Sequence, residues 1–329
     1  MEEVTKSGSQ ESGQKKKDIF WGLVALAIIV AGISYGVKSG QMHLVRTGDN
    51  SSSASAGNAI KNSSGATETD DQAIEAIIPV GGVELNISYG DLGSQLIKSG
   101  VIDFDKMSEL YKKNNSPLTQ EQIDMLVNGS DKNIVINRKN ANFLLNFFWA
   151  LGLANNNSIL TEGAMVKYGG IEKAGNFAST GGWTLGKGNA MQYYSKFNII
   201  SLTLEQQKIV ERVSANVFRP CCNNSTAFPD CNHGMAALAV IELMASRGTD
   251  EAEIYEALKY INSYWFSQAY YEISLLFKNK FNKSWEDVDA KEVLGKDYSS
   301  ATGNQSVHKY LQDNGLIKFL PASGSGCGV

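Results

Sequence analysis

The longest uninterrupted apolar run of the chain lies near the N-terminus, at residues 19–37. It contains no charged residue and approaches the roughly 20 apolar residues that a helix needs to cross the hydrocarbon core of a bilayer. It also lacks the polar face that a surface helix of a globular domain carries, which disfavours the alternative of a buried core helix. Tyr35, Gly36, Val37 and Lys38 close the run without a small-residue cleavage site. We therefore predict an uncleaved signal anchor at residues 19–37 rather than a cleaved signal peptide.

The residues before this run predict its orientation. Lys15, Lys16 and Lys17 directly precede it, and short basic segments tend to stay on the cytoplasmic side of a membrane. Residues 1–18 are thus expected to be a cytoplasmic tail. The main part of the chain is expected to be extracytoplasmic, on a single-pass protein of the cell membrane.

Composition divides the remainder of the chain into three parts. Residues 38–73 are rich in Ser, Gly, Ala, Asn and Thr, and such a composition cannot bury enough apolar surface to form a core. They are predicted to be a flexible linker. Residues 74–321 are long enough for one domain of ordinary to large size or for two small ones. Residues 322–329 form a Gly- and Ser-rich tail that carries Cys327 and is expected to be flexible.

Helical signals dominate residues 74–321. Thr119 and Thr203 are each followed by Glu and Gln, the pattern of a capping box at a helix start. Residues 140–153 are apolar on nearly every position and predict a helix buried on most sides, which would form the spine of the core. Further helices are expected to begin near Asp250 and to cover residues 268–281.

Strand signals are few and short, the best being residues 77–87 and 134–136. The predicted fold class is therefore mainly α, with a single N-terminal transmembrane helix and a helical extracytoplasmic domain that has minor β structure. The net charge is −4, and no basic stripe follows the predicted anchor. A nucleic-acid partner is disfavoured, because such proteins present basic surfaces to the phosphates.

A glycine-rich run at residues 179–188 invites comparison with phosphate-binding loops. Its spacing is wrong, because that motif needs Lys and then Ser or Thr directly after its last glycine. We interpret the run as a structural turn that lets Trp183 pack. A substrate-facing loop beside the cysteines is the alternative.

The most informative segment brings Cys221, Cys222, Cys231 and His233 within thirteen residues. A strongly apolar helix follows, for which Pro229 and Asp230 are expected to provide the lead-in and the N-cap. Cys231 and His233 would then lie in the first turn, with Leu238 and Ile241 buried against the 140–153 helix. A helix start and a nearby imidazolium both stabilise a thiolate, so Cys231 is the cysteine expected to be reactive.

Three interpretations of this cluster remain open. In the structural interpretation, one or two disulfides staple the segment and could include Cys327 of the tail. A bridge between adjacent cysteines would be strained, so Cys221 or Cys222 is expected to pair with Cys231. Alternatively, Cys221, Cys222, Cys231 and His233 offer a soft ligand set for Zn or Cu(I). In the third, Cys231 attacks a disulfide, Cys221 or Cys222 resolves it, and Cys327 acts as a mobile thiol carrier. Covalent c-type haem attachment is unsupported, because the chain contains no Cys-x-x-Cys-His motif.

A resemblance adds to this picture. The order Phe218-Arg219-Pro220-Cys221-Cys222-Asn223-Asn224, a helix, the run from Gly248 to Ile254 and an aromatic end at Tyr264-Trp265 is similar to the membrane-anchored thiol oxidoreductases of cytochrome c maturation. This resemblance implies a compact helical bundle that begins at a cysteine motif and reduces the apocytochrome. With residues 179–186 and 221–234 as fingerprints, the outer region also resembles uncharacterised membrane-anchored prokaryotic envelope proteins, which imply no activity.

Glu242 and His308 are two further ionisable residues within predicted helices. Glu242 lies within an apolar helix face, where a charge is unfavourable unless it is paired, so we expect it to contact the surroundings of His233 or to face solvent. His308 is expected on a short amphipathic helix as a surface or core residue. No Ser/His/Asp set or carboxylate pair supports a hydrolase.

The leading hypothesis is a membrane-tethered extracytoplasmic protein that exchanges thiols or handles a soft metal, with a thiol protein or a metal as partner. The alternative is a non-enzymatic envelope or interaction protein with structural disulfides. Converging free sulfurs would favour the first hypothesis, and closed buried disulfides the second.

Overall fold

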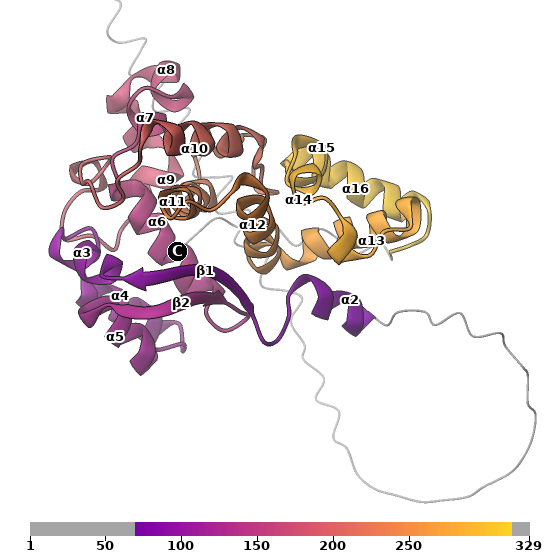
Figure 1. Cartoon of the computed structure of the whole chain (residues 1–329), viewed down its shortest axis with the longest axis horizontal. Helices are drawn as coiled ribbons and strands as arrows, with labels where there is room; N and C mark the ends of the chain where they lie inside the picture. Colours follow the sequence, from indigo (N-terminus) through magenta and orange to yellow (C-terminus); the bar gives the residue numbers. More distant parts are fainter. Residues whose placement is uncertain (1–69, 318–329) are drawn as a thin grey trace, which may run out of the picture. The chain divides into compact units, whose positions relative to one another are not determined.

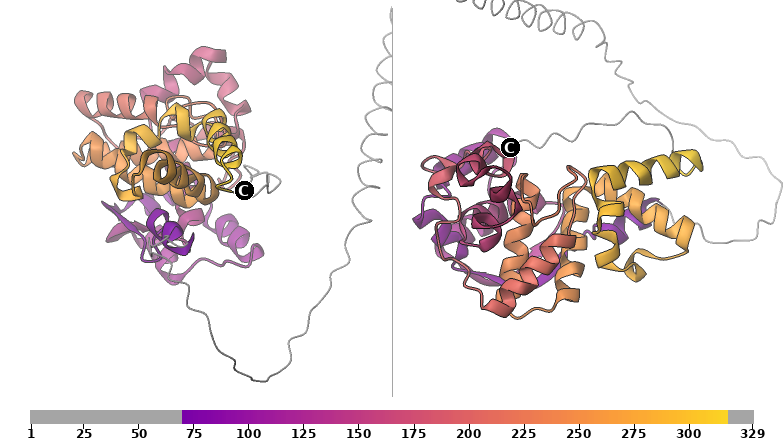
Figure 2. Two further views of the ribbon diagram at one scale, coloured as in Figure 1. Left: turned by 90° about the vertical axis from the view of Figure 1, so that its right-hand side faces the viewer. Right: turned by 90° about the horizontal axis from the view of Figure 1, so that it is seen from above.

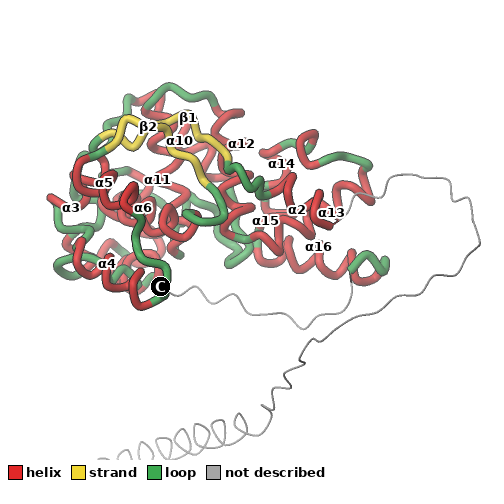
Figure 3. Tube along the Cα trace, turned by 90° about the horizontal axis from the view of Figure 1, so that it is seen from below, coloured by secondary structure: helices red, strands yellow, loops and turns green. Residues whose placement is uncertain are grey.

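The computed structural model describes residues 70–317 and confirms a mainly helical domain, which within this range carries a single two-stranded sheet (Figure 3). The first elements are α2 (Asp70–Ile77), β1 (Val83–Gly90), α3 (Leu92–Lys98), α4 (Phe104–Lys113), α5 (Gln120–Asn128), β2 (Ser130–Ile136) and α6 (Ala141–Ala154). The middle elements are α7 (Ser158–Thr161), α8 (Ala164–Gly169), η1 (Ile171–Asn176), α9 (Ala178–Gly181), η2 (Ala190–Gln192) and α10 (Leu204–Asn216). The last elements are α11 (Asn232–Ser246), α12 (Glu251–Trp265), α13 (Ser267–Phe281), η3 (Trp285–Asp287), α14 (Ala290–Val293), α15 (Lys296–Ser299) and α16 (Ala301–Asp313).

Helices α6 and α11 form the centre of the core. Nearly all residues of both helices are buried, and the two helices pack closely against each other. A Cβ atom added at Gly152 would lie 2.2 Å from the carbonyl oxygen of Met235, so the contact depends on the missing side chain. Leu238 and Ile241 are fully buried in this contact region. The predicted spine and the predicted burial of α11 against it are confirmed.

The helix starts read from the sequence agree with the structure. Thr119 and Thr203 each form a complete capping box, before α5 and α10. Asp250 caps α12, because its carboxylate accepts a hydrogen bond from the backbone N–H of Glu253. These signals depend on residues within one helical turn, so they do not depend on the rest of the fold.

The predicted strand at residues 77–87 is wrong at its beginning. Ile77 ends α2, and β1 starts only at Val83. Between them Gly82 adopts a positive φ of 85°, and a Cβ there would lie 2.7 Å from the carbonyl oxygen of Ile136. The chain therefore turns at Gly82 before β1 pairs in antiparallel register with β2.

The sheet and the C-terminal helices lie on different sides of the core. Helices α3, α4 and α5 accompany the two strands, whereas α13 to α16 gather on the other side of α12 (Figures 1 and 2). The segment that joins α10 to α11 holds the three described cysteines. It lies between these two groups of helices, beside the start of α16.

Several predictions fall outside the described residues. The cytoplasmic tail at 1–18, the membrane span at 19–37, residues 38–69 of the linker and Cys327 are among them. Helix α2 begins at Asp70, before the predicted domain start at residue 74. Among residues 70–317, no helix combines the length and apolar character needed to cross a membrane.

Candidate functional site

The loop from Val217 to Cys231 is held by hydrogen bonds from three directions. The backbone N–H and the hydroxyl of Thr226 both donate to the carbonyl oxygen of Val217, at 2.8 and 3.0 Å. The N–H of Ala301, at the start of α16, donates to the carbonyl oxygen of Cys222 at 2.8 Å. The N–H of Ser179 donates to the carbonyl oxygen of Asp230 at 3.0 Å. The cysteines are therefore presented by a fixed loop.

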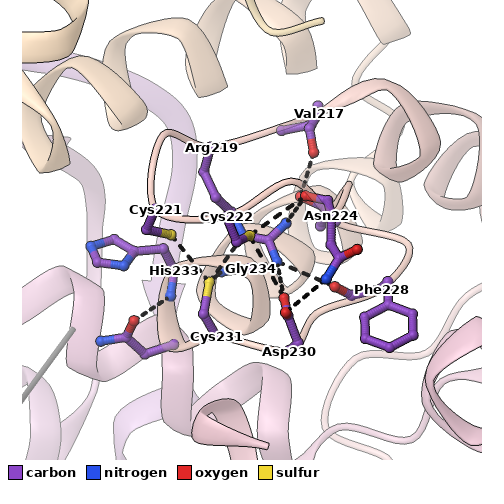
Figure 4. Close-up of polar contacts among 12 residues, drawn as sticks. Val217, Arg219, Cys221, Cys222, Asn224, Phe228, Asp230, Cys231, His233 and Gly234 are labelled. Carbon is purple, nitrogen blue, oxygen red and sulfur yellow. Dashed lines mark hydrogen bonds and ion pairs between the residues drawn. The ribbon is translucent and has the colours of Figure 1, made fainter. Parts of the chain in front are cut away.

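The guanidinium of Arg219 lies at the centre of this loop (Figure 4) and is only 1% exposed. Its Nε donates to Sγ of Cys231 at 3.0 Å, and its Nη1 donates to the carbonyl oxygen of Asn224 at 2.9 Å. Its Nη2 donates to the carbonyl oxygen of Phe228 at 3.2 Å and forms an ion pair with Asp230 at 2.7 Å. A buried guanidinium is tolerated when its donors and its charge are satisfied in this way.

Cys231 is the N-cap of α11, one residue later than the predicted cap at Asp230. Its Sγ accepts a hydrogen bond from the backbone N–H of Gly234 at 3.4 Å. The carboxylate of Asp230 is engaged elsewhere, because it binds Arg219 and accepts a hydrogen bond from Asn224 at 2.8 Å. The sulfur therefore takes the capping position.

The sulfurs of Cys221 and Cys231 are 3.5 Å apart. A disulfide bond is about 2.05 Å long, and all three cysteines within residues 70–317 are free thiols. The disulfide expected between Cys231 and one of the adjacent cysteines is thus not formed here. The sulfur of Cys222 lies within 4.8 Å of that of Cys231 and also contacts the carbonyl oxygen of Asn224 at 3.8 Å and the carboxylate of Asp230 at 3.7 Å.

The environment concentrates negative charge on Cys231. Hydrogen bonds from Cys221 and Cys222 lower the pKa of Cys231 well below its ordinary value, and the charge of Arg219 and the imidazole of His233 lower it further, against the effect of burial. The hydrogen bonds of Cys221 with Cys222 and Cys231 raise the pKa of Cys221. The pKa of Cys222 is lowered by its hydrogen bond with Cys221, but its hydrogen bond with Cys231 and burial raise it, to about 11. Of the three sulfurs, Cys231 is therefore the one whose thiolate form the surroundings favour most.

His233 completes the cluster from the first turn of α11. Its ring packs against Phe266, with ring centroids 4.4 Å apart, and against Trp265 at 5.7 Å. A ring nitrogen of His233 and the sulfurs of Cys221 and Cys231 all lie within 4.8 Å of one another. Nδ1 of this ring is buried and has no hydrogen-bond partner among the described residues.

The four predicted ligands do not form a single group in the described part of the chain. Cys221, Cys231 and His233 make one group of three, and Cys222, Asp230 and Cys231 make another. The two groups share Cys231. Cys327 lies outside the described residues, so its predicted role stays a prediction.

Sequence reasoning missed Arg219 as a site residue and assigned Asp230 only a capping role. A signal was present, because these two are the only Arg, Lys, Asp or Glu residues between Val217 and Gly234. Opposite charges flanking a cysteine pair, in a segment otherwise without charge, favour a local ion pair.

The glycine-rich run reaches the cysteine loop at Ser179, whose N–H donates to the carbonyl oxygen of Asp230, whereas His308 and Glu242 bond elsewhere. Nε1 of Trp183 donates to the carbonyl oxygen of Val101 at 2.8 Å, which agrees with the interpretation of the glycine-rich run as a structural turn. His308 is partly buried and bonds to the carboxylate of Glu272 at 2.9 Å. Glu242 is fully buried and accepts a hydrogen bond from Asn155 at 2.9 Å. Both locations expected for Glu242 are thus wrong.

Comparison with known proteins yields no relative: no family model matches the chain, and neither a curated protein nor a solved structure does.

Proposed function

We propose that the protein is a membrane-tethered extracytoplasmic thiol–disulfide exchange protein whose redox pair is Cys221 and Cys231. One observation carries the proposal: the two sulfurs lie 3.5 Å apart while Nε of Arg219 donates to the sulfur of Cys231 at 3.0 Å. A short approach of the sulfurs allows a bond to form with little movement. A fixed cation stabilises the thiolate released when that bond breaks. The tether is supported by the uncharged run at 19–37 and its basic flank.

Burial assigns different roles to the two sulfurs. Cys231 is 7% exposed, whereas Cys221 is partly exposed. A partner can therefore reach Cys221 more readily. The sequence favoured Cys231 as the attacking group. Its burial and its hydrogen bond from Arg219 suit a leaving and resolving group better.

The exchange begins from the Cys221–Cys231 disulfide. A partner thiolate attacks Sγ of Cys221, a partner–Cys221 disulfide forms, and Cys231 leaves as a thiolate. A second thiolate of the partner then attacks the partner sulfur of that mixed disulfide and expels Cys221, which takes up a proton. The partner dithiol loses two electrons and becomes a disulfide, and the pair gains them. Low pKa at the leaving sulfur accelerates the first step, and the same steps in reverse reduce a partner disulfide.

The proposal is tested on the full chain in detergent, free of metal, by equilibration in glutathione buffers of graded potential. Thiol trapping and mass spectrometry then locate the disulfide. We expect one reversible two-electron transition that links Cys221 to Cys231 and persists in Cys222→Ser. It should disappear in Cys221→Ser and in Cys231→Ser.

The rival function predicts a different result. If the cysteines only stabilise an interaction domain, the oxidised protein will resist reduction under native conditions, and forced reduction will unfold it. A transition that needs Cys222 in place of Cys221 would equally contradict the assigned pair.

A further inference from the structure

We infer that the reduced cluster is a Zn²⁺ site formed by Sγ of Cys221, Sγ of Cys231 and a ring nitrogen of His233. Two of these ligands are also the redox pair of the proposed function, so the inference deepens that function. Four features support this site: the spacing of the three donor atoms, an unpaired imidazole nitrogen, the supporting hydrogen bonds and the charge of the cluster.

The spacing fits a shared ion. Two thiolates bound to tetrahedral Zn²⁺ at about 2.3 Å lie about 3.8 Å apart, and a thiolate and an imidazole nitrogen lie about 3.6 Å apart. The sulfurs of Cys221 and Cys231 are 3.5 Å apart, and both lie within 4.8 Å of the His233 nitrogen. Adjustments of a fraction of an ångström to about 1 Å would bring all three donors to one centre.

The imidazole of His233 has a nitrogen that is available to bind a metal ion. Nδ1 of His233 is buried without a hydrogen-bond partner among residues 70–317, although the ring itself is held by Phe266 and Trp265. An unpaired buried polar atom is unfavourable. A metal ion bound to one ring nitrogen would leave the other nitrogen available for a hydrogen bond, as is usual for histidine ligands.

The surroundings supply the support that a metal ligand needs. Sγ of Cys231 accepts hydrogen bonds from Nε of Arg219 and from the N–H of Gly234. Such contacts orient a ligand and reduce the charge that it carries. The loop is also fixed at the start of α16, through the N–H of Ala301. The site is therefore largely formed before an ion arrives.

Charge favours Zn²⁺ over Cu(I). Two thiolates and Zn²⁺ together are neutral, and the ion pair between Arg219 and Asp230 is neutral as well. The same ligands around Cu(I) leave one negative charge in a largely buried site, and uncompensated buried charge is unfavourable. Both ions accept sulfur and imidazole ligands, so charge decides between them.

The second group of three is less suitable. Its carboxylate belongs to Asp230, which already binds Arg219 at 2.7 Å and Asn224 at 2.8 Å. A metal there would have to displace a buried ion pair. Cys222 is thus the natural control for Cys221, its neighbour in the chain.

Metal binding and disulfide formation exclude each other, because both use the same sulfur electrons. When the Cys221–Cys231 bond forms, the two zinc-bound thiolates give two electrons to a partner disulfide, which becomes a dithiolate and takes up two protons from solvent, and Zn²⁺ leaves with its charge unchanged. The ion therefore marks the reduced state, and oxidation releases it.

The test uses the reduced full chain in detergent, without oxygen, and Zn²⁺ as the probe. Calorimetry against a competing chelator measures stoichiometry and affinity, and X-ray absorption counts the ligands. We expect one Zn²⁺ per chain, with two sulfurs at about 2.3 Å and at least one nitrogen at about 2.0 to 2.1 Å. His233→Ala and His233→Gln should each weaken binding by more than about 100-fold, beyond the 10- to 100-fold typical of a supporting residue. Cys222→Ser and Cys327→Ser should bind as the parent chain does.

The variants separate the two proposals. His233→Ala should lose Zn²⁺ yet still form the Cys221–Cys231 disulfide, and oxidised parent protein should not bind Zn²⁺. A parent chain that forms the disulfide but binds no Zn²⁺ overturns the metal site alone. Zn²⁺ binding without a reversible disulfide overturns the exchange function alone. Loss of binding in Cys222→Ser, full binding in both His233 variants, or binding of Cu(I) with exclusion of Zn²⁺ also overturns the assignment.

Discussion

The guanidinium of Arg219 lies directly against the backbone of Gly234. A Cβ at residue 234 would come within 2.5 Å of Cζ and of Nη2 of Arg219. The N–H of the same glycine donates to the sulfur of Cys231. Glycine is unfavourable inside a helix, yet in the first turn of α11 it leaves room for the buried cation and keeps the sulfur capped.

Replacing Gly234 by alanine should displace Arg219 from Cys231. We expect a loss of about 1 to 3 kcal/mol in unfolding free energy, the usual range for overpacking, measured by denaturant titration of the reduced, metal-free chain. Gly81→Ala is the matched control, because a Cβ there meets nothing within 4 Å. An equal effect of both substitutions would show that the contact between Arg219 and Gly234 has no special weight.

Arg219→Lys should make stability less dependent on pH. In the parent chain the pKa of Cys231 is lowered, by hydrogen bonds from the other cysteines and by the charge of Arg219. Its thiolate therefore stabilises the fold above the unfolded pKa of about 8.5, and this stabilisation is lost as pH falls through the folded pKa. Lysine keeps the charge but not the fork of donors, so this pH-dependent part should shrink.

The measurement for this variant is unfolding free energy against pH in metal-free, reduced protein. A constant loss of about 2 to 4 kcal/mol is expected as well, because several buried groups lose their partner. Arg212→Lys is the control, since Arg212 forms an exposed pair with Glu251. Parallel pH profiles for parent and Arg219→Lys would contradict the role of Arg219 at the thiolate.

The helices were predictable because their signals are local. Thr119 and Thr203 determine helix starts through residues within one turn of them. The beginning of β1 was missed although a local signal was present. Pro79 and the Gly81-Gly82 pair are typical of a turn, and the N–H of Gly82 donates to the carbonyl oxygen of Pro79 at 3.0 Å. The close approach of Gly82 to Ile136, far away in the sequence, was not predictable, because periodicity carries no information about such a contact.

The same distinction applies to the site. Cysteines and a histidine crowded into one segment indicated where the chemistry lies. They did not reveal that Arg219 binds four groups of the loop, or that it withdraws Asp230 from the helix cap. Those facts depend on the folded path of the loop, and the cap moved to Cys231 as a consequence.

The membrane topology remains a prediction from the sequence. With the native cysteines replaced, a single cysteine at Ser53 should react with a membrane-impermeant maleimide in intact cells, because the basic flank holds the N-terminus inside. A cysteine at Ser9, before the apolar run, is the control and should react only after lysis. The reverse pattern would invert the orientation, and reaction of both positions in intact cells would argue against a span.

Glu242 shows what sequence patterning misses about burial. It lies on α11 at 0% exposure, with one carboxylate oxygen bonded to Asn155 and the other without a partner among the described residues. Burial raises the pKa of Glu242 to about 8, although the hydrogen bond from Asn155 and the nearby amide of Asn157 oppose the rise. The folded chain therefore holds this carboxyl protonated at neutral pH.

The contribution of Glu242 to stability should consequently fall as pH rises from about 4.5 to about 8, because in that window the folded state holds a proton on this carboxyl that the unfolded state has lost. The full effect amounts to at most about 5 kcal/mol. Glu242→Gln is neutral at every pH, so its unfolding free energy should match the parent near pH 4 and exceed it increasingly up to pH 8, as measured by denaturant titration. Glu205→Gln, at an exposed position, should follow the parent. If the parent and Glu242→Gln curves stay parallel across this window, Glu242 is ionised in the folded chain and its burial must be compensated by a partner.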